Sequence, residues 1–278
     1  MDRLITITRL TLHEARRRKI FLAILVCGLA FVALFSIGLL FVSREMSQSG
    51  RLPLVQRRLM SNFFILAGLY GVNFLTIVSA VLLPVDTLSG EIASGVMQTL
   101  AAKPIRRSEI LLGKWLGFAI VMTSYLALVA GGILIAGRVI AGFVPPHLAI
   151  GLPLMLLEGL VLLTLSVAGG ASMSTIANGI TVFGLYGLAF LGSWTEQIGA
   201  MAGNDTARAI GTAASLVMPS EALWQLAAWH MQPPLMRELQ LTPFSPASVP
   251  SGAMVAWAAG YVVVMLLVGL RRFHRRGL

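Results

Sequence analysis

The chain has 278 residues, of which 57% are hydrophobic and only 12% are charged. A soluble protein carries about 25% charged residues, so this composition excludes a soluble globular domain and favours an integral membrane protein. The net charge of +10 comes from basic residues that cluster beside apolar segments, which indicates anionic lipid headgroups rather than nucleic acid as their partner.

The first segment, residues 2–19, is amphipathic. A weakly apolar face is followed by four consecutive basic residues, Arg16 to Lys19. An amphipathic helix with a basic end binds the membrane interface through its apolar face and through anionic headgroups. We therefore expect residues 2–19 to form an interfacial helix before the first membrane span.

Six apolar segments follow, each at least as long as the roughly 18 residues that indicate a membrane-spanning helix. They predict an all-α membrane protein in which residues 1–278 form a single domain. The region 194–252 contains helix-like stretches at 206–217 and 220–231, and we expect the second to lie in the outer leaflet or to pack over the outer mouth of the bundle. The predicted spans are 20–42, 63–85, 115–136, 148–168, 176–193 and 253–270.

Basic residues predict the orientation of the chain, because lysine and arginine are enriched on the cytoplasmic side. With the N-terminus inside, 14 of the 21 basic residues fall in inner segments. The four arginines of the outer segment 43–62 are the exception. The sequence thus predicts cytoplasmic N- and C-termini, a cytoplasmic loop at 86–114 and an extracytoplasmic region at 194–252.

The inner loop 86–114 has the pattern of a short amphipathic helix held between two spans. Ser89 is a candidate N-cap, and Pro104 ends the helix because the residue before a proline is disfavoured in the α region. Ser108 is a candidate N-cap for the next helix, which continues into the third span. The alternative is an ordinary solvated loop. The apolar stripe of the predicted helix is formed by Ile92, Val96 and Leu100.

Several catalytic and nucleotide-binding motifs are absent from the sequence. There is no G-x-x-x-x-G-K-[ST], H-E-x-x-H or G-x-S-x-G, so we expect neither a P-loop nor a zinc-protease or hydrolase site. The four histidines fall in separate segments, so no metal site is expected.

Two polar residues inside predicted spans are candidates for a substrate pathway, Glu158 and Asn73. An ionised carboxylate within the bilayer is unfavourable by at least a few kcal/mol, so Glu158 should face a cavity, a partner chain or a group that shares its proton. The alternative is structural: a carboxyl hydrogen-bonded to a serine, threonine or asparagine of a neighbouring helix. Asn73 has the same two interpretations.

Small residues mark possible close contacts between helices. Gly113 and Gly117 open the third span with the spacing G-x-x-x-G, which lets helix backbones approach closely in lipid. Such glycines serve either packing within one bundle or a dimer seam, and packing within the bundle is the expectation here.

The inner loop resembles the first cytoplasmic loop of type-2 ABC transporter permeases, in particular the branch associated with multicopper-enzyme maturation. The resemblance extends to the layout of the whole chain, and Pro219 to Trp224 adds a weaker match. The matching residues are Glu91-Ile92-x-x-Gly95, Leu100, and Lys103-Pro104-Ile105-x-Arg107-x-Glu109-Ile110-Leu111-Leu112-Gly113-Lys114.

The resemblance implies a multi-pass permease of the cytoplasmic (inner) membrane. A separate cytoplasmic ABC ATPase would bind ATP and magnesium, this chain would bind no cofactor, and a second permease chain would complete a homodimer or heterodimer. An extracytoplasmic accessory protein is a further candidate partner, and residues 2–19 would be the elbow helix. The residues implied in coupling to the ATPase are Glu91, Gly95, Leu100, Pro104, Arg107 and Glu109.

Two other functions are compatible with six spans. A stand-alone secondary transporter or channel would work through Glu158, and it would be favoured by broken helices or charged pairs in matching halves of the chain. An intramembrane enzyme would need polar catalytic groups at one depth of the membrane. Because neither pattern is present, the permease is the preferred prediction, with the substrate left open.

Overall fold

The computed structural model describes residues 2–48, 53–93, 106–239, 244, 246 and 248–275, and these residues form helices and no strand. Six helices are long and apolar enough to cross a membrane, which confirms the predicted fold class. They are α2 (Lys19–Gln48), α3 (Leu54–Leu82), α6 (Arg107–Ala136), α7 (Leu148–Gly170), α8 (Thr175–Met201) and α12 (Gly252–Arg275). The others are α1 (Asp2–Arg17), α4 (Thr87–Ala93), the π-helical turn η1 (Gly137–Ala141), α9 (Asp205–Val217), α10 (Ser220–His230) and α11 (Pro234–Leu239).

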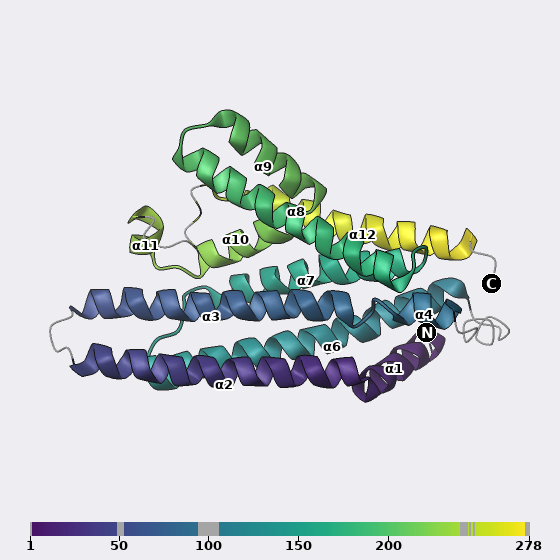
Figure 1. Cartoon of the computed structure of the whole chain (residues 1–278), viewed down its shortest axis with the longest axis horizontal. Helices are drawn as coiled ribbons and strands as arrows, with labels where there is room; N and C mark the ends of the chain where they lie inside the picture. Colours follow the sequence, from purple (N-terminus) through teal and green to yellow (C-terminus); the bar gives the residue numbers. More distant parts are fainter. Residues whose placement is uncertain are drawn as a thin grey trace.

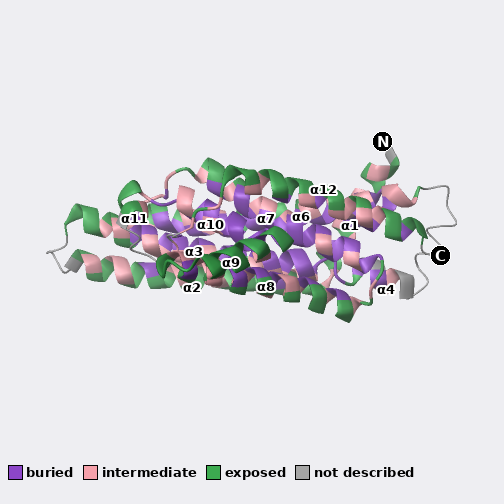
Figure 2. Cartoon of the chain, turned by 90° about the horizontal axis from the view of Figure 1, so that it is seen from above, coloured by how far each residue is buried: buried purple, intermediate pink, exposed green. Residues whose placement is uncertain are grey.

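Helices α3, α6 and α7 form the centre of the bundle. Their most apolar windows are 61%, 39% and 50% buried, whereas those of α2 and α12 are 11% and 17% buried. Figure 2 shows the same distribution, with buried residues concentrated along the middle of the molecule. The exposed faces of α2 and α12 are apolar, so lipid or another membrane protein must cover them.

One end of the bundle, which we call the terminal end, contains the start of α1, all of α4 and the last turn of α12 (Figure 1). Helices α3 and α7 end there, and α6 and α8 begin there. The opposite end contains the end of α2, the start of α3, η1 and α11. The described parts of the predicted inner loop, residues 86–93 and 106–114, therefore lie at the same end as the start of α1 and the end of α12.

Several helices extend beyond their predicted bounds. Helix α2 continues to Gln48 and α3 begins at Leu54, so most of the predicted outer loop 43–62 is helical. Arg57 Nη2 donates a hydrogen bond to Ser47 Oγ at 3.0 Å across the two helices. No glycine or proline directly follows Val42 or directly precedes Phe63, so both helices continue beyond the apolar residues.

The region 194–252 differs most from the simple expectation of an outer segment. Helix α9 returns along α8, and α10 packs along α7 in the interior of the protein (Figure 1). Trp224 of α10 is buried, with its ring 5.2 Å from that of Tyr70 on α3. Of the two placements expected for α10, the structure has the helix packed on the bundle.

Candidate functional site

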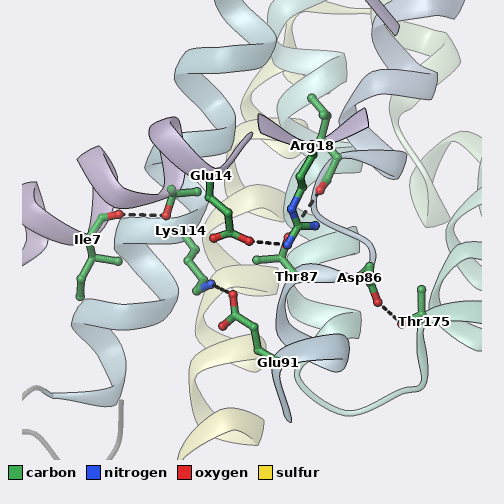
Figure 3. A network of polar contacts seen from close by, with 10 residues as sticks. Ile7, Glu14, Arg18, Asp86, Thr87, Glu91, Lys114 and Thr175 are labelled. Atoms are coloured by element: carbon green, nitrogen blue, oxygen red, sulfur yellow. Dashed lines mark hydrogen bonds and ion pairs between the residues drawn. The ribbon is translucent and has the colours of Figure 1, made fainter. Parts of the chain in front are cut away.

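Helix α4 is joined to α6 by a buried ion pair at the terminal end. Lys114 Nζ donates to Glu91 Oε1, and the two side chains are 6% and 13% exposed (Figure 3). Removing one partner from a buried ion pair is destabilising by about 3–5 kcal/mol, because the other charge is left without compensation. The pair therefore fixes the position of α4 relative to the first turns of α6.

A second set of contacts joins the start of α4 to the start of α8. Thr175 Oγ1 donates to Asp86 Oδ1 at 2.9 Å and lies 2.7 Å from Ser89 Oγ (Figure 3). The prediction that Ser89 caps the helix is wrong, because α4 already begins at Thr87. Ser89 instead donates to the carbonyl oxygen of Val85 at 3.1 Å.

The first residue of α6 contacts the end of α12. Arg107 Nη1 donates to the carbonyl oxygens of Phe273 at 3.3 Å and His274 at 3.1 Å. A guanidinium is favourable there, since the last carbonyls of a helix carry partial negative charge. These contacts join α6 and α12 at the terminal end.

The N-terminus of α6 is capped differently from the prediction. The helix begins at Arg107, so Ser108 lies inside it and is not its N-cap. Glu109 Oε2 accepts a hydrogen bond from the Arg106 backbone N–H at 3.0 Å, which satisfies one of the free donors of the first turn. The remaining implied coupling residues, Gly95, Leu100 and Pro104, lie outside the described residues.

Helix α1 packs on the start of α6 through the two glycines of the G-x-x-x-G motif. A Cβ added at Gly113 would lie 2.7 Å from Ile7, and one added at Gly117 would lie 2.7 Å from Thr11. Thr8 Oγ1 also donates to the Gly113 carbonyl oxygen at 3.3 Å. These two glycines therefore serve packing within the chain, as expected, and they bring α1 against the helix that carries Lys114.

This contact gives a testable prediction. Gly117→Ala should destabilise the folded chain by about 1–3 kcal/mol, because the added methyl group overlaps Thr11. The measurement is thermal unfolding of the purified chain in detergent. Gly131→Ala on the same helix is the matched control, since its added Cβ meets no atom within 4 Å. Equal destabilisation by the two variants would contradict the packing role of Gly117.

In the membrane interior, Asn73 of α3 contacts Glu158 of α7. Asn73 Nδ2 donates to Glu158 Oε2 at 2.9 Å, and the two residues are 1% and 0% exposed. The contact is the one expected in the structural alternative for Glu158. A role in substrate passage stays a prediction for both residues.

Two histidines from separate segments come together at the opposite end of the bundle. His147 Nδ1 lies 3.3 Å from the His230 carbonyl oxygen, and Arg237 Nη2 donates to the same oxygen at 2.8 Å. Burial lowers the pKa of His230, and the charges of Arg237 and His147 lower it further. The described part of the chain contains no group of three histidine, cysteine or acidic residues that could hold a metal ion.

A mostly apolar cavity of about 540 Å³ also lies at the opposite end. Arg58 of α3 is the charged residue in its wall. The other lining residues come from α3, the segment before α7 and the region around α11, so the cavity is separate from the Asn73–Glu158 contact. The lining includes Val55, Phe143, Pro146, Pro233 and Leu235.

A sequence profile described as "ABC-2 family transporter protein" matches residues 58–218, from α3 through α9. The chain belongs to this family. It is therefore a multi-pass membrane component of a transporter, that is, an ABC-2 permease. No curated protein matches the chain. The match is to the family as a whole, so the multicopper-enzyme-maturation branch stays a prediction.

The matched region of the permease contains both candidate sites. Glu91, Arg107 and Lys114 belong to the terminal-end cluster, and Asn73 and Glu158 belong to the interior contact. Two residues, Lys114 and Glu221, lie in the motifs that resemble the family, but the sequence did not predict their contacts. Lys114 is the last residue of the inner loop, and its long side chain folds back to Glu91. Glu221 follows a proline and a serine at the start of α10, and burial raises the pKa of its carboxyl to about 7.

Proposed function

We propose that this chain is the membrane-spanning subunit of an ATP-driven transporter of the cytoplasmic membrane. In this proposal a separate cytoplasmic ABC ATPase binds ATP and magnesium and docks at the loop 86–114. A second permease chain, identical or different, completes the transport pathway. Membership of the ABC-2 family supports the proposal, and the observation that carries it is the buried Glu91–Lys114 pair, which connects this loop to a membrane-spanning helix.

The mechanism follows from the contacts of α4. When the ATPase subunits close on ATP, they displace the loop 86–114. The displacement reaches α6 through Glu91–Lys114 and α8 through the contacts of Asp86 and Ser89 with Thr175. The ATPase can drive the change only by binding the two permease conformations with different affinity. Helix α3 leads directly into α4, so three membrane-spanning helices, α3, α6 and α8, then move together at the terminal end.

The experiment is reconstitution of the permease with the ABC ATPase encoded beside it. The expected result is a stable complex whose ATPase activity in lipid is higher than that of the ATPase subunit alone. The matched control is an ATPase subunit that binds ATP and cannot hydrolyse it, which should form the complex without turnover. A permease that binds no ATPase under these conditions would overturn the proposal.

The alternative is a stand-alone secondary transporter that uses Glu158. The burial of this carboxyl in the membrane interior is the observation in its favour. The two functions differ in their energy source. Proteoliposomes that contain the permease alone, with an imposed ion gradient and no ATPase, would accumulate substrate only in the second case.

A further inference from the structure

Two buried acids lie on helices that pack against each other. Glu158 belongs to α7 and is 0% exposed, and Glu221 belongs to α10 and is 5% exposed. Asn73, which donates to Glu158, lies one helical turn from Tyr70, and the Tyr70 ring is 5.2 Å from that of Trp224, one turn from Glu221. Helix α10 packs along α7, so this contact joins the region between α8 and α12 to the centre of the bundle (Figure 1).

The described residues supply no ion-pair partner to the two acids. Tyr70 of α3, whose ring lies 5.2 Å from that of Trp224 on α10, has a hydroxyl that is neutral at neutral pH.

Two cations on the other helices that pack on α7 have partners of their own. Lys114 of α6 is paired with Glu91, and Arg272 of α12 donates to Ser172 Oγ at 3.1 Å. His230 lies at the far end of α10 from Glu221. The two acids therefore have no counter-charge, which is unfavourable in a medium of low dielectric constant.

The oxygen atoms of the pair also lack hydrogen-bond donors. Within the described residues, Glu158 Oε1, Glu221 Oε2 and Asn73 Oδ1 are buried without a partner. All three are acceptors when both carboxyls are ionised. Two carboxylates buried in neighbouring positions avoid repulsion when one of them retains a proton.

We propose that Glu158 and Glu221 form a proton-binding site that holds α10 against α7. One carboxyl is protonated, so the pair carries one negative charge. When the proton leaves to water, both carboxylates are charged and repel each other, and α10 is released from α7. This inference concerns the stability of the permease itself and does not depend on an ATPase partner.

The proposal predicts the direction of the pH dependence. Burial raises the pKa of Glu221 to about 7 from an ordinary value of 4.5. The folded chain therefore holds more protons than the unfolded chain between these values, and the stabilisation is lost as the pH rises through about 7. We expect the melting temperature of the purified full chain to fall by at least about 5 °C between about pH 5 and about pH 8.

The test compares this pH response among variants in detergent. Glu221→Gln should remove most of the fall in melting temperature, and Glu158→Gln should reduce it without abolishing it, because burial still raises the pKa of Glu221. Glu196→Gln is the matched control, because this acid of α8 accepts a hydrogen bond from Ser248 at 2.7 Å and should keep the response. A double variant, Glu158→Gln with Glu221→Gln, that keeps the full response would overturn the proposal.

Infrared spectroscopy gives a second measurement that does not depend on the folding of a variant. The wild-type chain at about pH 6 should show the carbonyl stretch of a protonated carboxyl, and this band should disappear at about pH 9. Absence of the band at the lower pH would overturn the proposal. So would a rise in the alkaline melting temperature on addition of sodium, since the site would then bind a metal cation instead of a proton.

Discussion

Replacing Glu91 by lysine should uncouple the ATPase from the permease while the chain still inserts into the membrane. Lys114 is 6% exposed, so the variant would place two positive charges in a mostly buried site. Loss of the ion pair should destabilise the docked position of α4 by about 3–5 kcal/mol. This corresponds to a change of at least about a hundredfold in the equilibrium between the docked and released positions of α4. The measurement is ATPase activity of the reconstituted complex, which should fall to that of the ATPase subunit alone.

The exchange of both charges provides the decisive comparison. Glu91→Lys combined with Lys114→Glu restores an ion pair in the opposite direction and should recover part of the stimulation. Glu14→Lys is the matched control, since the Glu14–Arg18 pair on α1 is more exposed and an exposed pair is worth less than about 1 kcal/mol. If the double variant is no better than Glu91→Lys alone, α4 does not transmit motion through this pair.

The six spans could be predicted from the sequence because length and apolarity alone determine which helices cross a membrane. Helix ends were less predictable, since they depend on tertiary contacts. Ser89 has the chemistry of an N-cap, yet its hydroxyl lies beside Thr175 in the folded chain, and α4 begins two residues earlier. The prediction that Ser108 is the N-cap of α6 was wrong for a related reason, because Glu109 supplies the capping oxygen instead.

The two sites were predictable to different degrees. The spans and the basic residues placed Glu91 in the inner loop, and the resemblance implied its coupling role. Its partner Lys114 lies beyond Pro104, where no local pattern connects the two. Glu158 stood out as an acid inside an apolar span. Its relation to Glu221 arises only from the return of α9 along α8, which brings α10 into the bundle, and the sequence carries no periodic signal for that arrangement.

Glycines along α8 and α9 are the signal that could have revealed this return. A Cβ added at Gly192 would lie 2.3 Å from Ala214, and one added at Gly199 would lie 2.7 Å from Ala207. Small residues at these positions let the two helix backbones lie close together. Read as a set, they predict an antiparallel pair of helices rather than an extended outer region.

A second substitution with a large expected effect is at Gly211, where α9 packs on α8. A Cβ at this position would lie 2.5 Å from the Gly192 carbonyl oxygen and 2.7 Å from the Glu196 backbone nitrogen. Backbone atoms cannot rotate away as a flexible side chain can, so Gly211→Val should separate α9 from α8. Overpacking of this kind is destabilising by about 1–3 kcal/mol or more. Because α9 leads directly into α10, the displacement should also withdraw Glu221 from Glu158.

Two measurements check this prediction together. Thermal unfolding in detergent should show a lower melting temperature for Gly211→Val, and the pH response attributed to the acid pair should be lost with it. Gly187→Val on α8 is the matched control, since an added Cβ there meets no atom within 4 Å. Both variants add the same side chain to an apolar helix, so a difference between them reports the α8–α9 contact. If Gly211→Val keeps both the melting temperature and its pH dependence, the close contact of α9 with α8 does not determine the position of α10.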